Sequence, residues 1–241
     1  MPPLRHVLSR LPLLARVETQ TLLVLLIIAG ALWGFWELAD EVMEGGTHAF
    51  DESLLLALRE PGDIDDPIGG GNAEEAMRDL TALGGATWLL FLTAATAGAL
   101  ALMRRGRSAL LLIGAVAGGQ ILSHLTKSFF VRPRPDLVSH EADVHTASFP
   151  SGHSMMAAVT YLTLAVMLAR ATRLRRLKAY YLALAVVLTV AVGVSRVYLG
   201  VHWPSDVLAG WMIGAAWALL LYVVDEWLGQ RGAVEPERDE D

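Results

Sequence analysis

The stretch AYYLALAVVLTVAVGVSRVYLGVHWPSD, residues 179–206, contains both the structural pattern and the chemistry of this chain. It begins with an apolar segment long enough to cross a bilayer as a helix, which takes roughly 20 residues. That segment ends at Ser195-Arg196, and His202 and Asp206 follow before the next apolar segment. Ionisable side chains at such positions are costly and usually functional. The stretch therefore predicts a membrane protein with a functional site at the ends of its helices.

The composition of the whole chain supports a membrane protein. Of its 241 residues, 54% are hydrophobic, and the mean hydropathy is +0.45. Soluble domains of this length are seldom so apolar. The net charge of −6 argues against a nucleic-acid partner. The absence of cysteine excludes disulfides, thiolate zinc sites and cysteine nucleophiles.

Hydropathy predicts an all-α fold, a polytopic membrane helical bundle with six transmembrane helices. The first segment is expected to be an anchor rather than a signal peptide, because it is long, follows a 19-residue tail and lacks a small-residue cleavage site. The six expected spans lie near residues 20–38, 84–103, 108–126, 154–169, 179–196 and 206–228.

The loop charges predict the orientation of the bundle. Arg and Lys are concentrated in the loops 104–107 and 170–178 and in the N-terminal tail. The positive-inside rule places such loops in the cytoplasm, and acidic residues such as those of the tail 229–241 count for little. We therefore expect a multi-pass protein of the cell inner membrane with both termini cytoplasmic. In this topology every polar cluster falls on the outer face.

No repeat or linker divides the chain, so we expect a single domain over residues 1–241, with a motif core at 127–206. The longest loop, 39–83, lies outside and is acidic and Gly-rich. Within it, residues 50–58 carry apolar side chains at helical spacing. This pattern predicts a short helix, which either lies on the membrane surface or packs over the outer ends of the bundle.

The first polar cluster is Lys127-x6-Arg134-Pro135. A lone cation at a helix end is commonly an interfacial anchor. Here two successive Arg-Pro pairs keep the chain extended, because a residue before proline avoids the helical region. An extended backbone allows Arg134 to reach away from its own span. A planar guanidinium can bind two phosphate oxygens, and Lys127 adds a point charge.

The second cluster is Pro150-Ser151-Gly152-His153. Taken alone, it is an ordinary turn with a Ser helix cap. The same geometry also forms an anion site, because the first backbone N–H groups of the next span have no intrahelical partner and the helix dipole is positive there. Gly152 permits close approach of a phosphate to the backbone.

The third cluster is Ser195-Arg196-x5-His202-x3-Asp206. Pro204 suits the first turn of the sixth span, so His202 is expected just before that helix, within reach of Asp206. The alternative is an N-terminal carboxylate that stabilises its helix, beside an unrelated interfacial histidine. In either case we expect His202 at the membrane interface.

Together the three clusters resemble the signature of the type 2 phosphatidic acid phosphatase superfamily, called PAP2. All three motifs are present without substitution and in order between residues 127 and 206. The family includes lipid phosphate phosphatases, undecaprenyl pyrophosphate phosphatases and vanadium haloperoxidases. Its spacing selects Arg134 and leaves Arg132 as an accessory contact.

The resemblance implies a catalytic site. His202 is expected to attack phosphorus and form a phosphohistidine, with Asp206 orienting its imidazole. His153 is expected to protonate the leaving oxygen and then activate water. The residues expected to bind the phosphate oxygens are Lys127, Arg134, Ser151, Gly152 and Arg196.

The expected activity is metal-independent hydrolysis of a lipid phosphomonoester or pyrophosphate, with no cofactor. The candidate substrates are phosphatidate, phosphatidylglycerophosphate and undecaprenyl pyrophosphate, and membrane lipids are the expected surroundings. The motifs recognise only phosphate, so they do not choose among these substrates, and they do not determine the oligomeric state. Two alternatives remain: a vanadium haloperoxidase-like oxidoreductase, and a non-catalytic membrane transporter whose site would lie nearer the bilayer midplane.

Overall fold

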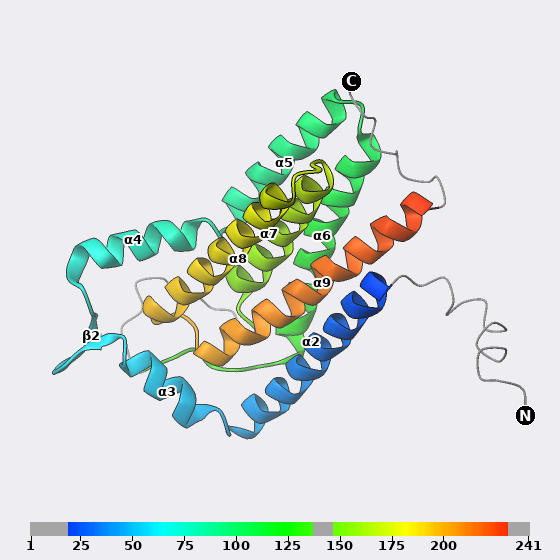
Figure 1. Cartoon of the computed structure of the whole chain (residues 1–241). Coiled ribbons are helices and arrows are strands. Elements are labelled where there is room, and N and C mark those ends of the chain that lie inside the picture. Colours follow the sequence, from blue (N-terminus) through cyan, green and yellow to red (C-terminus); the bar gives the residue numbers. More distant parts are fainter. Residues whose placement is uncertain (1–18, 137–146, 231–241) are drawn as a thin grey trace, which may run out of the picture.

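The computed structural model describes residues 19–136 and 147–230. Both chain ends, including most of the acidic tail, therefore lie outside the described residues, as do His140 and His145 of the loop between the first two motifs. Within the described part, helices dominate and the only sheet is a two-stranded hairpin. The expectation of an all-α membrane bundle is confirmed (Figure 1).

Five helices are long and apolar enough to cross a membrane. A sixth span is obtained if α4 (Gly70–Ala82) and α5 (Ala86–Leu102), which meet at 47°, are counted as one. With 17 residues, α5 is only about 25 Å long at 1.5 Å per residue. The predicted count of six is therefore approximate. The five long helices are α2 (Thr19–Glu44), α6 (Gly106–Phe129), α7 (Gly152–Arg170), α8 (Arg175–Tyr198) and α9 (Pro204–Gln230).

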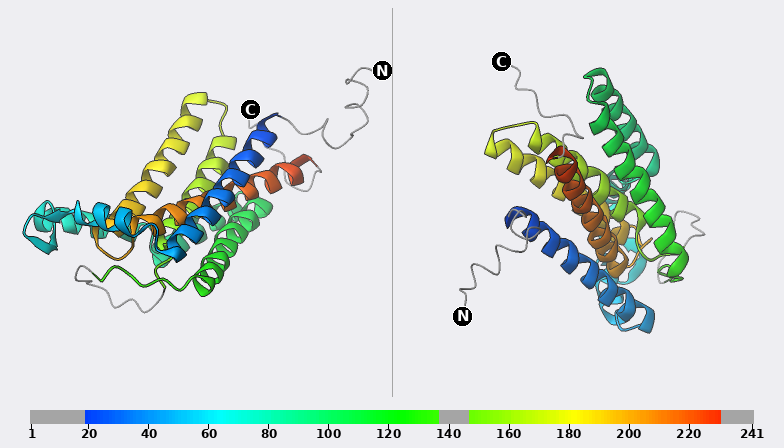
Figure 2. Two further views of the ribbon diagram at one scale, coloured as in Figure 1. Left: turned by 90° about the horizontal axis from the view of Figure 1, so that it is seen from below. Right: turned by 90° about the vertical axis from the view of Figure 1, so that its right-hand side faces the viewer.

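Helix α7 occupies the centre of the bundle and packs against α6, α8 and α9, while α2 lies along α9 (Figure 2). Glycines on α9 allow α7 to approach closely. A Cβ atom added at Gly210 would lie 2.7 Å from the Ser151 carbonyl oxygen, and one at Gly214 would lie 2.6 Å from that of Met155. This contact holds the start of α7 beside the start of α9.

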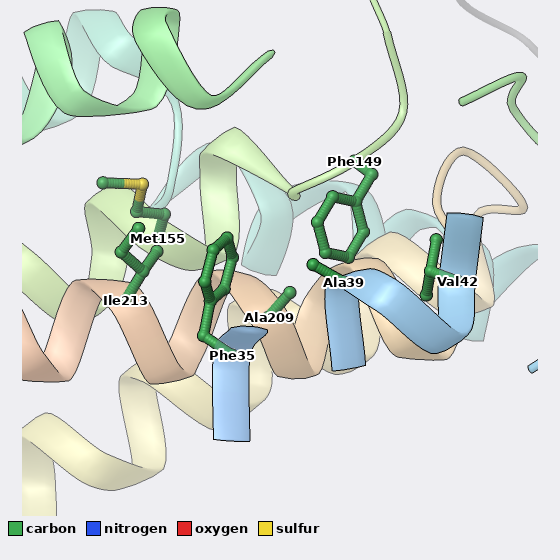
Figure 3. Close-up of a cluster of buried hydrophobic side chains, with 7 residues drawn as sticks. All are labelled: Phe35, Ala39, Val42, Phe149, Met155, Ala209 and Ile213. Atoms are coloured by element: carbon green, nitrogen blue, oxygen red, sulfur yellow. The ribbon is translucent and has the colours of Figure 1, made fainter. Parts of the chain in front are cut away.

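A buried apolar cluster fixes the chain just before the Pro150-Ser151 turn (Figure 3). Phe149 is fully buried, stacks on Phe35 of α2 at 5.9 Å and meets Phe130 edge-on at 5.3 Å. The turn is therefore held by side-chain packing on both sides. The cluster consists of Phe35, Ala39, Val42, Phe149, Met155, Ala209 and Ile213.

The segment between α2 and α5 projects from one end of the bundle (Figure 1). It contains α3 (His48–Leu56), the antiparallel strands β1 (Arg59–Glu60) and β2 (Asp63–Pro67), and then α4. Leu55 of α3 is fully buried against Trp203 and Val207. The short helix predicted in the outer loop is present, and it packs over the bundle ends. The hairpin was not predicted, because its strands are too short to show a period.

Candidate active site

The three motifs meet at the end of the bundle where α6 and α8 end and α7 and α9 begin. The Ser151 backbone N–H donates to the Asp206 carbonyl oxygen at 3.0 Å, which joins the second motif to the third. Arg134 joins the first motif to the third, because its Nη1 lies 3.3 Å from His202 Nε2. His153 lies within electrostatic range of His202 and of the three cations that are predicted to bind phosphate. The structure therefore brings every predicted site residue into one region.

His202 lies at the helix ends, and its depth at the membrane interface stays a prediction. Its side chain is only 1% exposed, so the protein encloses it. The reason is that α3 and the Arg132–Pro135 segment cover the start of α9. Burial lowers the pKa of His202 to about 4, and the neighbouring Arg196 and Arg134 act in the same direction, against the opposing effect of Asp206. The ring is therefore neutral at pH 7 and can act as a nucleophile.

The hydrogen bonds around His202 determine which nitrogen is free to react. Nδ1 lies 3.3 Å from Asp206 Oδ2, and Nε2 faces the Arg134 guanidinium. The carboxylate of Asp206 accepts a hydrogen bond from Nδ1–H, so the proton of the neutral ring lies on Nδ1 and the lone pair lies on Nε2. That nitrogen points toward the cation that would bind a phosphate oxygen.

Asp206 is held in place by donors on both of its oxygens. Oδ2 accepts from the Trp203 backbone N–H at 2.9 Å and from the Ser148 hydroxyl, as well as from His202. Oδ1 accepts from Arg132 Nη1 at 2.7 Å. A buried carboxylate with this many donors is stable in its charged form and in one orientation.

Arg132 has a different role from the accessory phosphate contact suggested by the motif spacing. Its guanidinium bridges two fully buried carboxylates, with Nη1 at 2.7 Å from Asp206 and Nη2 at 2.7 Å from Asp51. Nη1 also donates to Ser205 Oγ at 2.7 Å, and the group lies 5.5 Å above the Trp203 ring. The Arg132 guanidinium therefore holds Asp206 and Asp51 in place.

Asp51 and Ser148 are site residues that the sequence reasoning missed. Asp51, on α3, accepts from the Ser205 backbone N–H at 2.8 Å and from its hydroxyl at 2.6 Å, so it caps the start of α9 from another segment. A signal for Asp51 was present, since it interrupts the apolar spacing of residues 50–58. Ser148 has no comparable signal.

The three cations are anchored on different elements. Lys127 Nζ donates to the Ala147 carbonyl at 3.1 Å, and Arg134 Nη1 donates to that of Val201 at 2.6 Å. Arg196 Nη1 donates to Thr81 Oγ1 at 3.0 Å, which links α8 to α4. Among the described residues, Arg196 Nε has no hydrogen-bond partner, so this cation keeps a donor for an anionic ligand.

The Ser151-Gly152 turn opens α7 as predicted. Ser151 is the N-cap, and its hydroxyl oxygen accepts from the Ser154 backbone N–H at 3.5 Å. A Cβ atom added at Gly152 would lie 3.5 Å from Lys127 Cε, so the free helix terminus and the Lys side chain are adjacent. Backbone N–H groups and a cation there form an anion-binding arrangement. Within the described residues, no group of three or more His, Asp or Glu side chains is placed to hold a metal ion.

Comparison with known proteins decides the family. The PAP2 superfamily model matches residues 108–230. The chain belongs to the PAP2 superfamily. Its PAP2 region carries all three motifs, whereas Asp51 and Thr81, which contact motif residues, lie before the match.

The relatives of this PAP2 protein are phosphatases. Phosphatidylglycerophosphatase B of Bacillus subtilis is 36% identical over 63% of this chain and 75% of its own length. Undecaprenyl-diphosphatase of Sulfolobus acidocaldarius is 32% identical over 48% of this chain and 50% of its own length. The crystal structure of a transmembrane PAP2-type phosphatidylglycerolphosphate phosphatase from Bacillus subtilis has a TM-score of 0.74 and 29% identity, covering 83% of this chain and 96% of that one. The protein is a multi-pass membrane phosphatase of this family.

Proposed function

We propose that the protein hydrolyses the phosphomonoester or pyrophosphate of a membrane lipid through a phosphohistidine on His202. The observation that carries the proposal is the position of His202 Nε2, which faces Arg134 while Asp206 accepts from Nδ1. A neutral nucleophile directed at a phosphate-binding cation suits attack on phosphorus. The burial of the site residues at the helix ends suits a lipid whose phosphate lies at head-group level.

The reaction proceeds in two steps. His202 Nε2 forms a bond to phosphorus as the bond from phosphorus to the leaving oxygen breaks. This oxygen belongs to the lipid alcohol in a monoester and to the lipid phosphate in a pyrophosphate, and His153 gives it a proton. His153 then takes a proton from water, whose oxygen attacks the phosphohistidine and releases inorganic phosphate. Asp206 stabilises the imidazolium that forms in the first step. Lys127, Arg134, Arg196 and the N–H groups after Ser151 stabilise the charge on the transferring group.

Arg132 and Asp51 support this chemistry indirectly. Arg132 holds Asp206 at 2.7 Å, and Asp51 holds Arg132 at the same distance from the opposite side. We assign both as positioning residues for the His202–Asp206 pair. Because Asp51 belongs to the outer segment, the proposal treats that segment and the motif core as one functional unit.

The orientation that we propose places the site on the outer face of the cell inner membrane, with both termini cytoplasmic. The support is the concentration of Arg and Lys in the loops 104–107 and 170–178, at the opposite ends of the helices from the motifs. An enzyme so placed acts on lipid phosphates exposed on the outer leaflet.

Phosphate release by the purified protein in detergent tests the function. Wild-type protein is expected to release phosphate from lipid phosphates with EDTA present, whereas His202→Ala is expected to release none. Acid-quenched reactions with labelled substrate should trap a base-stable phosphohistidine in the wild type alone. A transporter would release no phosphate, and a haloperoxidase would oxidise halide with orthovanadate, which should instead inhibit a phosphatase. Robust hydrolysis by a folded His202→Ala variant would disprove the assignment.

A further inference from the structure

A cavity of about 520 Å³ lies beside the proposed phosphate site, between the hairpin, α4 and the end of α8. Two of its lining residues also belong to the site. Arg196 is a phosphate-binding cation, and the carbonyl of Val201 holds Arg134 immediately before His202. The cavity is therefore continuous with the place where the scissile phosphate would lie. The proposed two-step reaction uses Arg196 of this lining but neither Arg59 nor the carboxylates.

The deep wall of the cavity contains two buried arginines with unused donors. Arg59 is 6% exposed and Arg196 is 9% exposed. A guanidinium has five N–H donors. Among the described residues, each makes a single side-chain hydrogen bond, Arg59 to the Tyr198 carbonyl and Arg196 to Thr81, and each has an Nε without a partner. Buried donors without partners are rare in proteins, and at a cavity they indicate a missing ligand.

The outer wall of the same cavity is acidic. Asp63, Asp65 and Asp66 come from β2, and Glu74 from α4, where it pairs with Arg78 at 2.6 Å. The lining thus combines three arginines with four carboxylates. A second phosphate would meet several like charges here, and an ammonium group would meet the two buried guanidiniums. A hydroxyl group both donates and accepts, so it can bond to both walls.

We propose that this cavity binds an uncharged, hydroxyl-bearing part of the substrate next to the scissile phosphate. The inference rests on the proposed phosphatase function and narrows its substrate class. The preferred substrates are lipid phosphomonoesters whose esterified carbon chain carries a free hydroxyl, in preference to pyrophosphates. Arg59 donates to the hydroxyl oxygen, and one carboxylate of the pair Asp66 and Glu74 accepts from its single O–H.

A matched pair of lipids tests this proposal. 1-Oleoyl-lysophosphatidate carries a free hydroxyl beside the phosphate-bearing carbon, and its 2-deoxy analogue lacks only that hydroxyl. Farnesyl pyrophosphate provides a second phosphate. We expect wild-type kcat/KM to favour the hydroxyl-bearing lipid over its analogue by roughly tenfold, as for loss of a hydrogen bond to a charged group.

The variant Asp66→Asn/Glu74→Gln should bring the ratio of kcat/KM between lysophosphatidate and its deoxy analogue close to one. It should also raise kcat/KM for farnesyl pyrophosphate, since two repelling charges are gone. Asp79→Asn is the control, because this exposed carboxylate is on α4 but outside the cavity lining. Equal wild-type rates on the two lysolipids, or an equal loss on all three substrates in the double variant, would overturn the proposal. Absence of phosphate release from every substrate would instead count against the phosphatase function.

Discussion

At the scale of single residues, the two arginines of the RPRP segment have separate tasks. Arg134 faces His202 Nε2, whereas Arg132 bonds to Asp206 and Asp51. Removing the positive partner of two buried carboxylates should cost about 3–5 kcal/mol of stability. We therefore expect Arg132→Gln to lower both the melting temperature and kcat, with KM nearly unchanged, whereas Arg134→Gln should raise KM as well.

A double variant separates positioning from simple loss of charge. Adding Asp51→Asn to Arg132→Gln removes one of the two uncompensated carboxylates, so part of the lost stability should return. Thermal melts in detergent, with kcat and KM measured on the same samples, check both statements. Additive destabilisation, or a mild effect of Arg132→Gln alone, would contradict the bridging role.

The pH dependence of the reaction follows from the buried nucleophile. Burial lowers the pKa of His202 to about 4, and Arg134 contributes to the depression. A protonated imidazole has no lone pair on Nε2, so kcat/KM should be retained at mildly acidic pH and fall as pH drops through about 4. Arg134→Gln removes a nearby positive charge and should move this acid limb to higher pH.

The matched control for that measurement is Arg175→Gln, an exposed arginine at the far end of α8. It should leave the acid limb of the kcat/KM profile in place. A limb near the ordinary histidine pKa of about 6.5, unmoved by Arg134→Gln, would show that another group controls the reaction.

The motif spacing selected Arg134, and the structure places this arginine beside His202; its role in binding phosphate stays a prediction. The partners of Arg132 could not be identified in this way. Asp51 is 81 residues away and Asp206 is 74 residues away, and only the packing of α3 over α9 brings the three together. The same packing explains why the His202 side chain is buried by the protein, which its sequence neighbourhood does not reveal.

At the scale of helices, the contact between α7 and α9 positions the active-site turn. A Cβ atom at Gly214 would lie 2.6 Å from the Met155 carbonyl oxygen and 2.8 Å from Ala158 Cβ. Gly214→Ala should therefore push the helices apart at a cost of roughly 1–3 kcal/mol. We expect a lower melting temperature and a lower kcat, since the Ser151–Asp206 contact depends on this packing.

Gly114→Ala on α6 is the control for this prediction, because nothing lies within 4 Å of its added Cβ. In an unobstructed helix interior, alanine is more stable than glycine by roughly 0.5–1 kcal/mol. The two substitutions should therefore shift the melting temperature in opposite directions. Equal shifts would show that α7 and α9 do not depend on the glycine contact.

Hydropathy located the long helices well, because lipid-facing helices must be apolar along their length. It placed the second span at 84–103 but could not reveal the 47° bend between α4 and α5. That bend depends on contacts of α4 with α8, including Thr81 with Arg196. Similarly, the short strands of the hairpin are stabilised by their surroundings rather than by any sequence period.

At the scale of the whole molecule, the remaining prediction is sidedness. The loop between the first two motifs, which contains His140, lies outside the described residues. The labelling position on the side of the motifs is therefore Asn72 on α4. Asn72→Cys should react with a membrane-impermeant maleimide in intact spheroplasts. Ala171→Cys, at the opposite end of the bundle, should react only after the membrane is opened. Both positions are exposed, and the chain has no native cysteine.

The reverse labelling pattern would place the motifs in the cytoplasm. It would remove the argument that the enzyme meets lipids of the outer leaflet, while the arrangement around His202 would stand. The observation that supports the predicted orientation is the charge of the loops.

The two sides of the cavity come from different parts of the chain, and this affects how substrate preference can change in evolution. Its deep side includes Arg196 from the family core, whereas its acidic side belongs to β2 and α4, which precede the region matched by the family model. Substitutions on the acidic side can therefore change which substrate is preferred, without altering the residues that are proposed to bind and cleave the phosphate. Asp51 limits this freedom, because it also precedes the matched region yet holds Arg132 in place. A chimaera that exchanges residues 60–80, and so keeps Thr81, should retain its catalytic machinery, whereas one that also discards Asp51 should lose it.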